Sequence, residues 1–429
     1  MDIHVFPSHP TGAIRIPGSK SHTIRSLLLS LLCDGQSIIT GALTSGDGRS
    51  AINAAKSFGA VVTEEGDTLF ITGVGKNIIA PSNVIDTANS GTTTTLFSSV
   101  AALCEGYTII TGDEQIRRRS IEALIEALNT LGARAFFTHP SRTAPPVIIA
   151  GALSGGRVTV DGRNSQVVSS LLLAAPLSTG DIEILVTNAL ETPYVQLTLD
   201  WMERYGVSVE HDGNYTHFLV RGGQSYTAGK HTIAADWSSA AFPLIAAAIT
   251  ASRLTVEGLD FCDAQGDRAI IEHLRLFAAD VVADKESGSV TVTGGTPLIG
   301  GHTIDLGPTP DMLPALAVLA TQASGTTRFT NLAQVRQKET DRVFEMQRKL
   351  TALGASVRIE GDDLLVKGKS AITGGRISSE GDHRIAMALA VAGLASNEGI
   401  VIEDAGCIDV SFPLFIEKLC ACGATIHRL

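Results

Sequence analysis

Basic side chains occur at several places where a helix is expected to begin. Six segments open with Ser, Asn or Asp: Ser19-Lys20-Ser21-His22-Thr23-Ile24-Arg25, Asn89-Ser90-Gly91-Thr92-Thr93, Asn164-Ser165-Gln166, Asp236-Trp237-Ser238-Ser239, Asp311 and Asp382-His383-Arg384. These residue types cap helix N-termini, and capping alone is the favoured interpretation for Asp236. Capping does not explain Lys20, Arg25 and Arg384, because a cation opposes the helix dipole at that end. An anion bound between each cation and the free backbone N–H groups would explain all three.

Two further basic clusters lie in segments that precede amphipathic helices. They are Arg117-Arg118-Arg119 and Arg336-Gln337-Lys338-Glu339-Thr340-Asp341-Arg342. A charge run is usually a solvated face, but the whole chain has a formal net charge of −11 and repels phosphates in general. Cations concentrated in a few segments of such a chain predict a small-molecule site for more than one anion. The same net charge argues against nucleic acid as a partner.

Composition restricts the class of protein. A hydrophobic content of 44% with 18% charged residues is typical of a soluble globular protein. The longest apolar stretch, 385–395, is too short to span a bilayer, and the first residues lack the pattern of a signal peptide. Six scattered cysteines form no disulfide framework, so we expect the reducing cytoplasm. Cys420 and Cys422 have no second ligand pair nearby, and we expect neither a metal nor a cofactor.

The elements that position these residues follow from an internal repeat. A helical pattern that ends at Gly or Ala and runs into a β-branched strand recurs at intervals of about 70 to 75 residues. The copies are Phe58-Gly59-Ala60, Leu131-Gly132-Ala133, Tyr205-Gly206-Val207, Phe277-Ala278-Ala279, Leu353-Gly354-Ala355 and Cys422-Gly423-Ala424. Each repeat also has an earlier helix that is apolar nearly all round and belongs inside a domain. Glycines 35, 106, 180 and 325 are expected to end four of these inner helices.

This pattern predicts an α/β protein of two domains with six βαβαββ units, three per domain. Inner apolar helices would form the core, with sheets and amphipathic helices outside. Because three units need about 215 residues, we expect one domain at 18–229. The other would combine 1–17 and 230–429.

Several segments together resemble a known family. Pro17-Gly18-Ser19-Lys20-Ser21-x-x-x-Arg25 is similar to the first motif of the 3-phosphoshikimate 1-carboxyvinyltransferase (EPSP synthase) family, and Asn89-Ser90-Gly91-Thr92 is similar to its glycine loop. Lys338-Glu339-Thr340-Asp341-Arg342 and Asp382-His383-Arg384 resemble its later motifs and are the most specific. The resemblance runs from Pro17 to Pro413 and implies the six-unit fold with a cleft that closes on substrate. It implies transfer of the enolpyruvyl group of phosphoenolpyruvate to the 5-hydroxyl of shikimate 3-phosphate.

The resemblance also implies a role for individual residues. Phosphoenolpyruvate would be bound by Lys20, Gly91, Arg119, Gln166, Arg342 and Arg384. Shikimate 3-phosphate would be bound by Ser21, Arg25, Asn164, Ser165, Gln166, Asp311, Gln334 and Lys338. Asp311 would take the proton of the attacking hydroxyl, Glu339 would protonate the methylene carbon, and Lys20 would complete the catalytic set. No cofactor is implied, and we expect a monomer.

Several positions depart from the family pattern. A late lysine is missing before Ser411-Phe412-Pro413, and Thr95 replaces an arginine of the glycine loop. Asn164, Gln334 and Ser120 replace a serine, an asparagine and a proline. Glu191 stands where a phosphate-binding serine is expected, and a carboxylate beside a bound phosphate lowers affinity unless it points away or pairs with a cation. We hypothesise that Arg117 or Arg118 restores the lost positive charge.

These departures leave alternatives open. A related family, UDP-N-acetylglucosamine enolpyruvyl transferase, carries a reactive cysteine where this chain has Asp113-Glu114-Gln115, so that acceptor is not favoured. A different hydroxyl acceptor, including one that lacks the phosphate, stays open because of Glu191. A ligand-binding paralogue without catalysis is a third possibility, but pure binding requires neither Asp311 nor Glu339.

Overall fold

Each repeat folds as a βαβαββ unit in which a parallel strand pair is followed by an antiparallel hairpin. The third repeat shows the pattern without interruption: β10 (Gly156–Asp161), α5 (Ser165–Ala174), β11 (Ile182–Thr187), α6 (Thr192–Arg204), β12 (Glu210–His211) and β13 (His217–Val220). Strand β10 runs parallel to β11, and β13 lies antiparallel to both β11 and β12. The crossover helix α5 therefore starts after the carboxyl end of β10. This places Ser165 at the end of the sheet where the parallel strands β10 and β11 finish.

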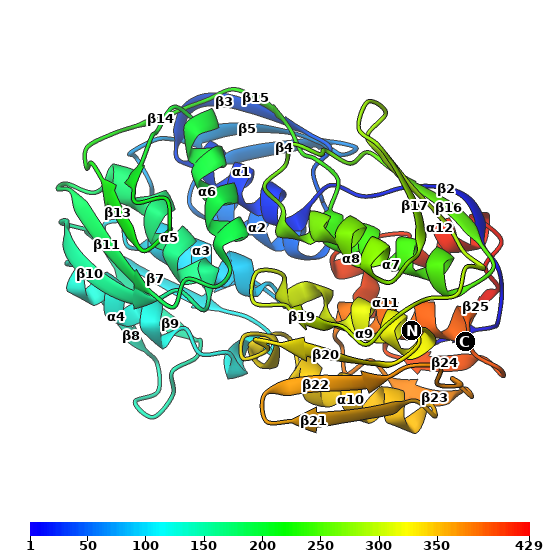
Figure 1. Ribbon diagram of the computed structural model, residues 1–429. Coiled ribbons are helices and arrows are strands. Elements are labelled where there is room, and N and C mark those ends of the chain that lie inside the picture. The colour runs from blue at the N-terminus through cyan, green and yellow to red at the C-terminus, as the bar shows by residue number, and fades with distance from the viewer. The chain divides into compact units, whose positions relative to one another are not determined.

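The computed structural model describes residues 1–429 and divides them into two compact parts. We call Gly18–Ile233 the inserted part, and Met1–Pro17 with Ala234–Leu429 the split part. The repeat pattern predicts a domain at 18–229, and the compact part ends at Ile233. The α/β fold of βαβαββ units that the sequence predicts is confirmed (Figure 1).

The inserted part contains three sheets and six α-helices. Its inner helices are α1 (Lys20–Leu31), α3 (Gly91–Ala101) and α5, and its outer helices are α2 (Gly46–Ser57), α4 (Glu122–Thr130) and α6. Its other strands are β3 (Cys33–Thr40), β4 (Val61–Glu65), β5 (Thr68–Val74), β6 (Ile85–Asp86), β7 (Tyr107–Thr111), β8 (Arg134–Phe137), β9 (Val147–Ala150), β14 (Tyr226–Thr227) and β15 (Lys230–Thr232).

The split part repeats the scheme. Its inner helices are α7 (Trp237–Ile249), α9 (Leu313–Gln322) and α11 (His383–Leu394), and its outer helices are α8 (Ile270–Leu276), α10 (Arg342–Ala352) and α12 (Phe415–Ala421). Its strands are β1 (Ile3–Val5), β2 (Thr11–Arg15), β16 (Arg253–Glu257), β17 (Asp280–Asp284), β18 (Ser289–Thr293), β19 (Thr303–Asp305), β20 (Thr326–Thr330), β21 (Ser356–Glu360), β22 (Asp363–Lys367), β23 (Gly375–Ser378), β24 (Ile400–Glu403) and β25 (Ile426–Arg428).

Strands next to the division complete repeats that are distant in sequence. Strand β1 lies between β24 and β25 and completes the last repeat, so both ends of the chain meet in one sheet (Figure 1). Strand β2 precedes α1 in the sequence but pairs in parallel with β16. Strand β15 precedes α7 but pairs in parallel with β3. In the inserted part, the sheet of β3 therefore gains β15 from the C-terminal end of that part. In the split part, the sheet of β16 gains β2 from the N-terminal segment.

The inner helices form the core of each part. Every residue of α11 is buried, and α7, α9 and α11 contact one another. In the inserted part, α3 contacts both α1 and α5. A helix buried on all sides is expected to be apolar nearly all round, and α11 fits this after its first two residues, His383 and Arg384. No helix combines the length and the hydropathy that a membrane span requires.

The expected stops of the inner helices are wrong in detail, because none of the four glycines directly follows its helix: α1 ends at Leu31, α3 at Ala101, α5 at Ala174 and α9 at Gln322. Gly35 does not end the first inner helix, because α1 ends at Leu31 and Gly35 lies inside β3 with a φ of 108°. Gly35 pairs with Gly73 of β5, and a Cβ at Gly73 would lie 2.1 Å from the carbonyl oxygen of Ser30. Gly73 therefore permits the close approach of β5 to the end of α1, and Gly35 supplies the positive φ of β3 at the paired position.

The stops of the outer helices follow the repeat closely. Gly59, Gly132, Gly206, Gly354 and Gly423 all have φ between 85° and 105°. In the copy without glycine, Ala278 takes the same left-handed place with a φ of 59°. The conformation is thus imposed by the repeat, and Ala278 adopts it despite the steric strain on its Cβ.

Candidate active site

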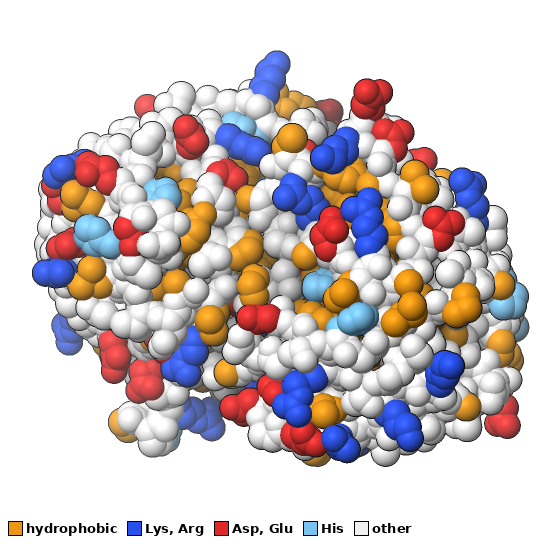
Figure 2. Space-filling view, viewed as in Figure 1, with side chains coloured by type: hydrophobic (Ala, Val, Ile, Leu, Met, Phe, Trp, Pro, Cys, Tyr) orange, Lys and Arg blue, Asp and Glu red, His pale blue; other side chains and the backbone are white.

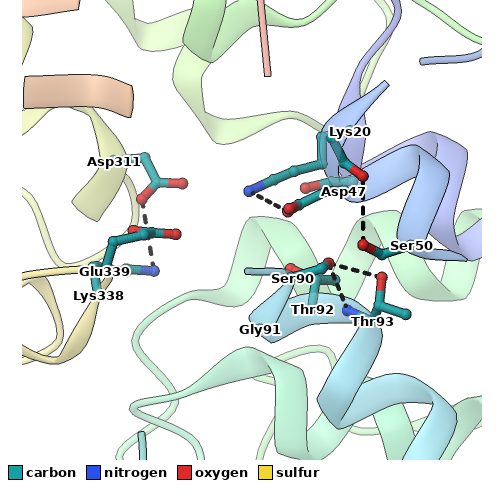
Figure 3. Close-up of polar contacts among 12 residues, drawn as sticks. Lys20, Asp47, Ser50, Ser90, Gly91, Thr92, Thr93, Asp311, Lys338 and Glu339 are labelled. Atoms are coloured by element: carbon teal, nitrogen blue, oxygen red, sulfur yellow. Dashed lines mark hydrogen bonds and ion pairs between the residues drawn. The ribbon is translucent and has the colours of Figure 1, made fainter. Parts of the chain in front are cut away.

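Lys20 lies at the first position of α1 and faces a carboxylate of the next helix. Its Nζ is 3.1 Å from Oδ2 of Asp47, which lies in the first turn of α2 (Figure 3). Both side chains are largely buried, and the side chain of the N-cap residue Ser19 makes no capping hydrogen bond. Asp47 therefore balances the charge that the helix dipole opposes. No sequence motif marks Asp47 as a site residue.

Gly91 opens α3 beneath the guanidinium of Arg119. Ser90 caps the helix by accepting a 3.2 Å hydrogen bond from the N–H of Thr93 (Figure 3). A Cβ added to Gly91 would lie only 2.7 Å from Nη1 of Arg119. The absence of a side chain thus lets a cation lie directly over a helix N-terminus, which is an arrangement that binds anions.

Gln166 joins α5 to α3 through both ends of its amide. Its Oε1 accepts a 3.2 Å hydrogen bond from Oγ1 of Thr95, and its Nε2 donates a 3.3 Å bond to Oγ1 of Thr92. Asn164 accepts a 3.0 Å bond from the N–H of Gln166 and serves as the helix cap. Thr95, which replaces an arginine of the family pattern, therefore positions Gln166.

Arg25 is 1% exposed and uses its guanidinium to connect three segments of the inserted part. Its nitrogens donate to Oγ1 of Thr198 at 2.8 Å, to the carbonyl of Ser21 at 3.1 Å, and to Oγ of Ser169 and the carbonyl of Tyr194 at 3.3 Å each. Burial lowers the pKa of Arg25 to about 10, although attraction to Tyr194 and Glu191 opposes that shift. Arg25 is therefore a buried cation at the acceptor-side residues.

Ser165 is bonded to the residue that departs most from the family pattern. Its backbone N–H and its Oγ both donate to Oε2 of Glu191, at 3.0 and 2.6 Å. Ser165 opens α5, and Glu191 is the N-cap of α6. The Glu191 carboxylate therefore points at the start of α5, not away from it.

In the split part, one buried guanidinium gathers three carboxylates. Arg342, the first residue of α10, donates from Nη1 to Asp311 at 2.8 Å and from Nε to Asp382 at 2.8 Å. Its Nη2 donates to Glu339. Burial alone lowers the pKa of Arg342, but attraction to Asp382, Glu339 and Asp311 outweighs burial and raises it. Asp311 and Glu339, the two carboxylates expected to transfer protons, therefore both bind the guanidinium of Arg342.

Two more cations surround Asp311. Nζ of Lys338 lies 3.7 Å from Oδ1 of Asp311 (Figure 3), and Nη2 of Arg384 lies 3.3 Å from Oδ2. Asp311 lies in a 3₁₀ turn, Pro310–Met312, and does not cap α9, whose N-cap is Met312. Asp311 therefore lies one turn before the helix that it was expected to open. Its carboxylate contacts the cations of Lys338, Arg342 and Arg384.

Asp382 caps α11, the last inner helix, and joins it by hydrogen bonds to Thr340 and Arg342. It accepts from the N–H groups of Arg384 and Ile385 at 3.0 and 3.4 Å, and from Oγ1 of Thr340 at 3.1 Å. Its bond to Arg342 spans 40 positions of sequence. In the sequence, Asp382 stands out as part of the Asp382-His383-Arg384 motif and not as a site residue of its own. Gln334 is buried at the N-cap of the 3₁₀ turn Val335–Gln337.

The three consecutive arginines Arg117, Arg118 and Arg119 have different partners. Arg117 donates to the carbonyl of Gly112 at 2.6 Å, and Arg118 is 72% exposed and pairs with Glu114. These contacts give no support to the hypothesis that Arg117 or Arg118 replaces the missing charge. In the view of Figure 2, basic and acidic side chains are interspersed, which fits anion attraction by local clusters and not by a broad basic face.

Known proteins match this chain over its whole length. The family described as EPSP synthase (3-phosphoshikimate 1-carboxyvinyltransferase) matches residues 7–419. A 3-phosphoshikimate 1-carboxyvinyltransferase of Methanocella arvoryzae is 43% identical over 429 residues, 100% of both chains, and one of Ruminiclostridium cellulolyticum is 40% identical with the same coverage. A solved structure of EPSP synthase from Acinetobacter baumannii has a TM-score of 0.82 and 27% identity, with 99% of each chain covered.

Proposed function

Because the chain belongs to the EPSP synthase family, we propose that the residues at its helix starts bind the two anionic substrates of that enzyme and transfer protons between them. The chain transfers the enolpyruvyl group of phosphoenolpyruvate to shikimate 3-phosphate and releases phosphate. This is a transferase reaction of the shikimate pathway, which leads to the aromatic amino acids. The named relatives favour neither a different hydroxyl acceptor nor a non-catalytic paralogue.

The proposed binding roles use cations and helix starts together. Lys20, Gly91, Arg119, Gln166, Arg342 and Arg384 bind phosphoenolpyruvate, and Ser21, Arg25, Asn164, Ser165, Gln166, Asp311, Gln334 and Lys338 bind shikimate 3-phosphate. Phosphoenolpyruvate is small and carries two anionic groups, so arginine forks and helix N-termini suit it. Lys20 and Arg119 each lie at such a start.

The placement of Asp311 and Glu339 on Arg342 carries the catalytic proposal. In the addition step the acceptor oxygen bonds to the central carbon of phosphoenolpyruvate, Asp311 takes the hydroxyl proton, and Glu339 gives a proton to the methylene carbon. This forms a tetrahedral intermediate with a methyl group. Glu339, left anionic by the addition, then takes one proton back from the methyl group while phosphate leaves, which gives the enol ether. Lys20 stabilises the negative charge of the phosphate as it leaves.

Two carboxylates with opposite proton roles need different surroundings. Asp311 lies near Lys338, Arg342 and Arg384, which favour its anionic form and suit a proton acceptor. Glu339, three positions before Arg342 in the sequence, forms an ion pair with it. The two groups therefore share the cation of Arg342, and Lys338 and Arg384 also lie near Asp311.

The test is phosphate release in D₂O. With shikimate 3-phosphate the wild type releases phosphate and places deuterium on the product methylene, because the intermediate has a methyl group. Asp311→Asn and Glu339→Gln each lower kcat by about 10²- to 10⁴-fold, the range for one acid or base group. Glu360→Gln, which changes an exposed carboxylate of β21, is the control and keeps wild-type kcat. Wild-type rates in both site variants would refute the assigned roles.

We also propose a monomeric enzyme of the cytoplasm. All six cysteines are free thiols, and burial raises the pKa of Cys33 and of Cys104 to about 12. Thiols with such pKa values react slowly, as expected for structural cysteines. Elution at the monomer volume in size-exclusion chromatography with light scattering tests the oligomeric part of this proposal.

A further inference from the structure

Glu191 places a buried carboxylate at the start of α5. Its side chain is 2% exposed, and Oε2 accepts from the backbone N–H and from Oγ of Ser165, at 3.0 and 2.6 Å. An N–H group at a helix start, a serine hydroxyl and a positive helix end are the donors that would otherwise bind one oxygen of a phosphate. We call the backbone N–H and the Oγ of Ser165 at the start of α5 the anion cradle. The carboxylate of Glu191 already accepts hydrogen bonds from both donors of this cradle.

The charge of Glu191 is also felt by Arg25, the buried cation of the same region. Arg25 donates to Ser169 of α5 and to Thr198 of α6, so it ties together the two helices that carry Ser165 and Glu191. Attraction to Glu191 is one of the effects that oppose the lowering of the Arg25 pKa by burial. The region of the anion cradle therefore contains an anion, Glu191, and a cation, Arg25, before any substrate binds.

This arrangement differs from a phosphate site built of hydroxyl groups. A hydroxyl cap can donate to a phosphate oxygen, but a carboxylate accepts only and repels it. Ser165 cannot give its Oγ hydrogen to Glu191 and to a phosphate at the same time. Binding of a phosphate through Ser165 therefore requires that Glu191 leave Oγ and the N–H of Ser165.

We propose that Glu191 is a built-in occupant of the acceptor-phosphate position, which the phosphate of the substrate displaces, and that it sets affinity for phosphorylated acceptors. The proposal rests on the proposed role of Ser165 in binding shikimate 3-phosphate. Without substrate, the carboxylate keeps the start of α5 neutralised. With shikimate 3-phosphate, the phosphate takes over both donors and Glu191 turns away. With shikimate, which has no phosphate, Glu191 stays in place.

Calorimetric titration of the full chain with shikimate 3-phosphate and with shikimate separates these effects. Glu191→Ser removes the competing anion and restores a hydroxyl, so the Kd for shikimate 3-phosphate falls by about tenfold, the equivalent of one charge-assisted hydrogen bond. Glu191→Gln keeps the shape and loses the charge, and its Kd falls by a smaller factor. The Kd for shikimate changes less than about twofold in both variants, because no phosphate competes.

The control is Glu183→Gln in β11. Glu183 pairs with Arg157 and His217 at the surface, so this change removes one charge of the inserted part without touching the cradle. A matching fall of Kd in Glu183→Gln would show a general charge effect and overturn the proposal. An unchanged or raised Kd for shikimate 3-phosphate in both Glu191 variants would also overturn it, as would equal changes for the two ligands.

The steady-state rates keep this result separate from the proposed function. If the wild type releases phosphate with saturating shikimate 3-phosphate while the Glu191 variants keep the wild-type Kd, the cradle proposal fails and the function stands. If the wild type gives no turnover, the proposed function itself fails. A merely structural role of Glu191 would lower the melting temperature of both variants and leave the ratio of the two Kd values unchanged.

Discussion

Arg342 donates a 2.8 Å hydrogen bond from Nη1 to Oδ1 of Asp311, although the two residues lie 31 positions apart in the sequence. The same guanidinium also binds Glu339 and Asp382. Three carboxylates would repel one another without it, so the placement of Asp311 depends on a residue of another helix. Arg342 is therefore both a proposed phosphoenolpyruvate ligand and the group that positions the two proton-transfer residues.

Arg342→Lys tests this double role. A single ammonium cannot supply the planar fork that bonds to three carboxylates at once. We expect kcat to fall by about 10²-fold or more, with a higher KM for phosphoenolpyruvate. The control is Arg348→Lys on the same helix, because Arg348 is 47% exposed and its ion pairs lie at the surface. Wild-type kcat in Arg342→Lys, with an unchanged melting temperature, would contradict the positioning role.

Gly91→Ala tests the contact between the start of α3 and Arg119. The added Cβ would lie 2.7 Å from Nη1 of Arg119, so the end of that flexible side chain must move. We expect the KM for phosphoenolpyruvate to rise by about tenfold, as for the loss of one charge-assisted hydrogen bond. The KM for shikimate 3-phosphate should stay close to the wild-type value.

Gly406→Ala is the matched control, since its added Cβ would approach nothing closer than Met1 at 3.7 Å. Equal kinetic effects of the two alanines would argue against a specific contact between Gly91 and Arg119.

Thr95→Val tests whether Thr95 positions Gln166. The change removes the hydroxyl that donates to Oε1 of Gln166 and to the carbonyl of Gly91. Loss of such a bond amounts to about 1 kcal/mol, so we expect a rise of about fivefold in the KM for phosphoenolpyruvate. The control is Thr108→Val, because Oγ1 of Thr108 is buried without a hydrogen-bond partner. If both valines leave every KM unchanged, Gln166 needs no support from Thr95.

Ala278→Gly concerns stability alone. Ala278 holds a φ of 59° directly after α8, where the other five repeats have glycine. Glycine relieves the strain of the left-handed conformation but adds entropy to the unfolded chain, and we expect a net gain of about 0.5 to 1 kcal/mol. Differential scanning calorimetry should show the transition of the split part about 1 to 4 °C higher. Ala279→Gly, at a position without positive φ, should lower it.

Local chemistry made most of the helix starts predictable. Ser90, Asn164, Asp236 and Asp382 all accept capping bonds, because a side-chain oxygen next to a helix start has a nearby donor to satisfy. Asp311 was harder to place, because Pro310 and Pro314 flank it and the chain enters α9 through a 3₁₀ turn. A cap pattern read without its prolines misses that turn.

Partners across the fold were not predictable from the sequence. Nothing in the neighbourhood of Lys20 points to Asp47, and the bond between Arg342 and Asp382 joins two separate helices. Such pairs depend on how repeats are placed in three dimensions, and one sequence carries no record of that placement. For the same reason, Glu191 could be recognised as a departure while its bond to Ser165 could not.

The pairing of β1 and β2 has a consequence for how the chain is made. The inserted part is complete once β15 has left the ribosome, because β15 pairs with β3 of the same part. Strand β2 must wait for β16, and β1 must wait longest, since it pairs with β24 and β25. At a synthesis rate of about 5 to 20 residues per second, the remaining roughly 200 residues take about 10 to 40 s. During that time β1 is an unpaired strand of three residues, and its shortness with the nearby Pro7 and Pro10 limits its pairing with other nascent chains.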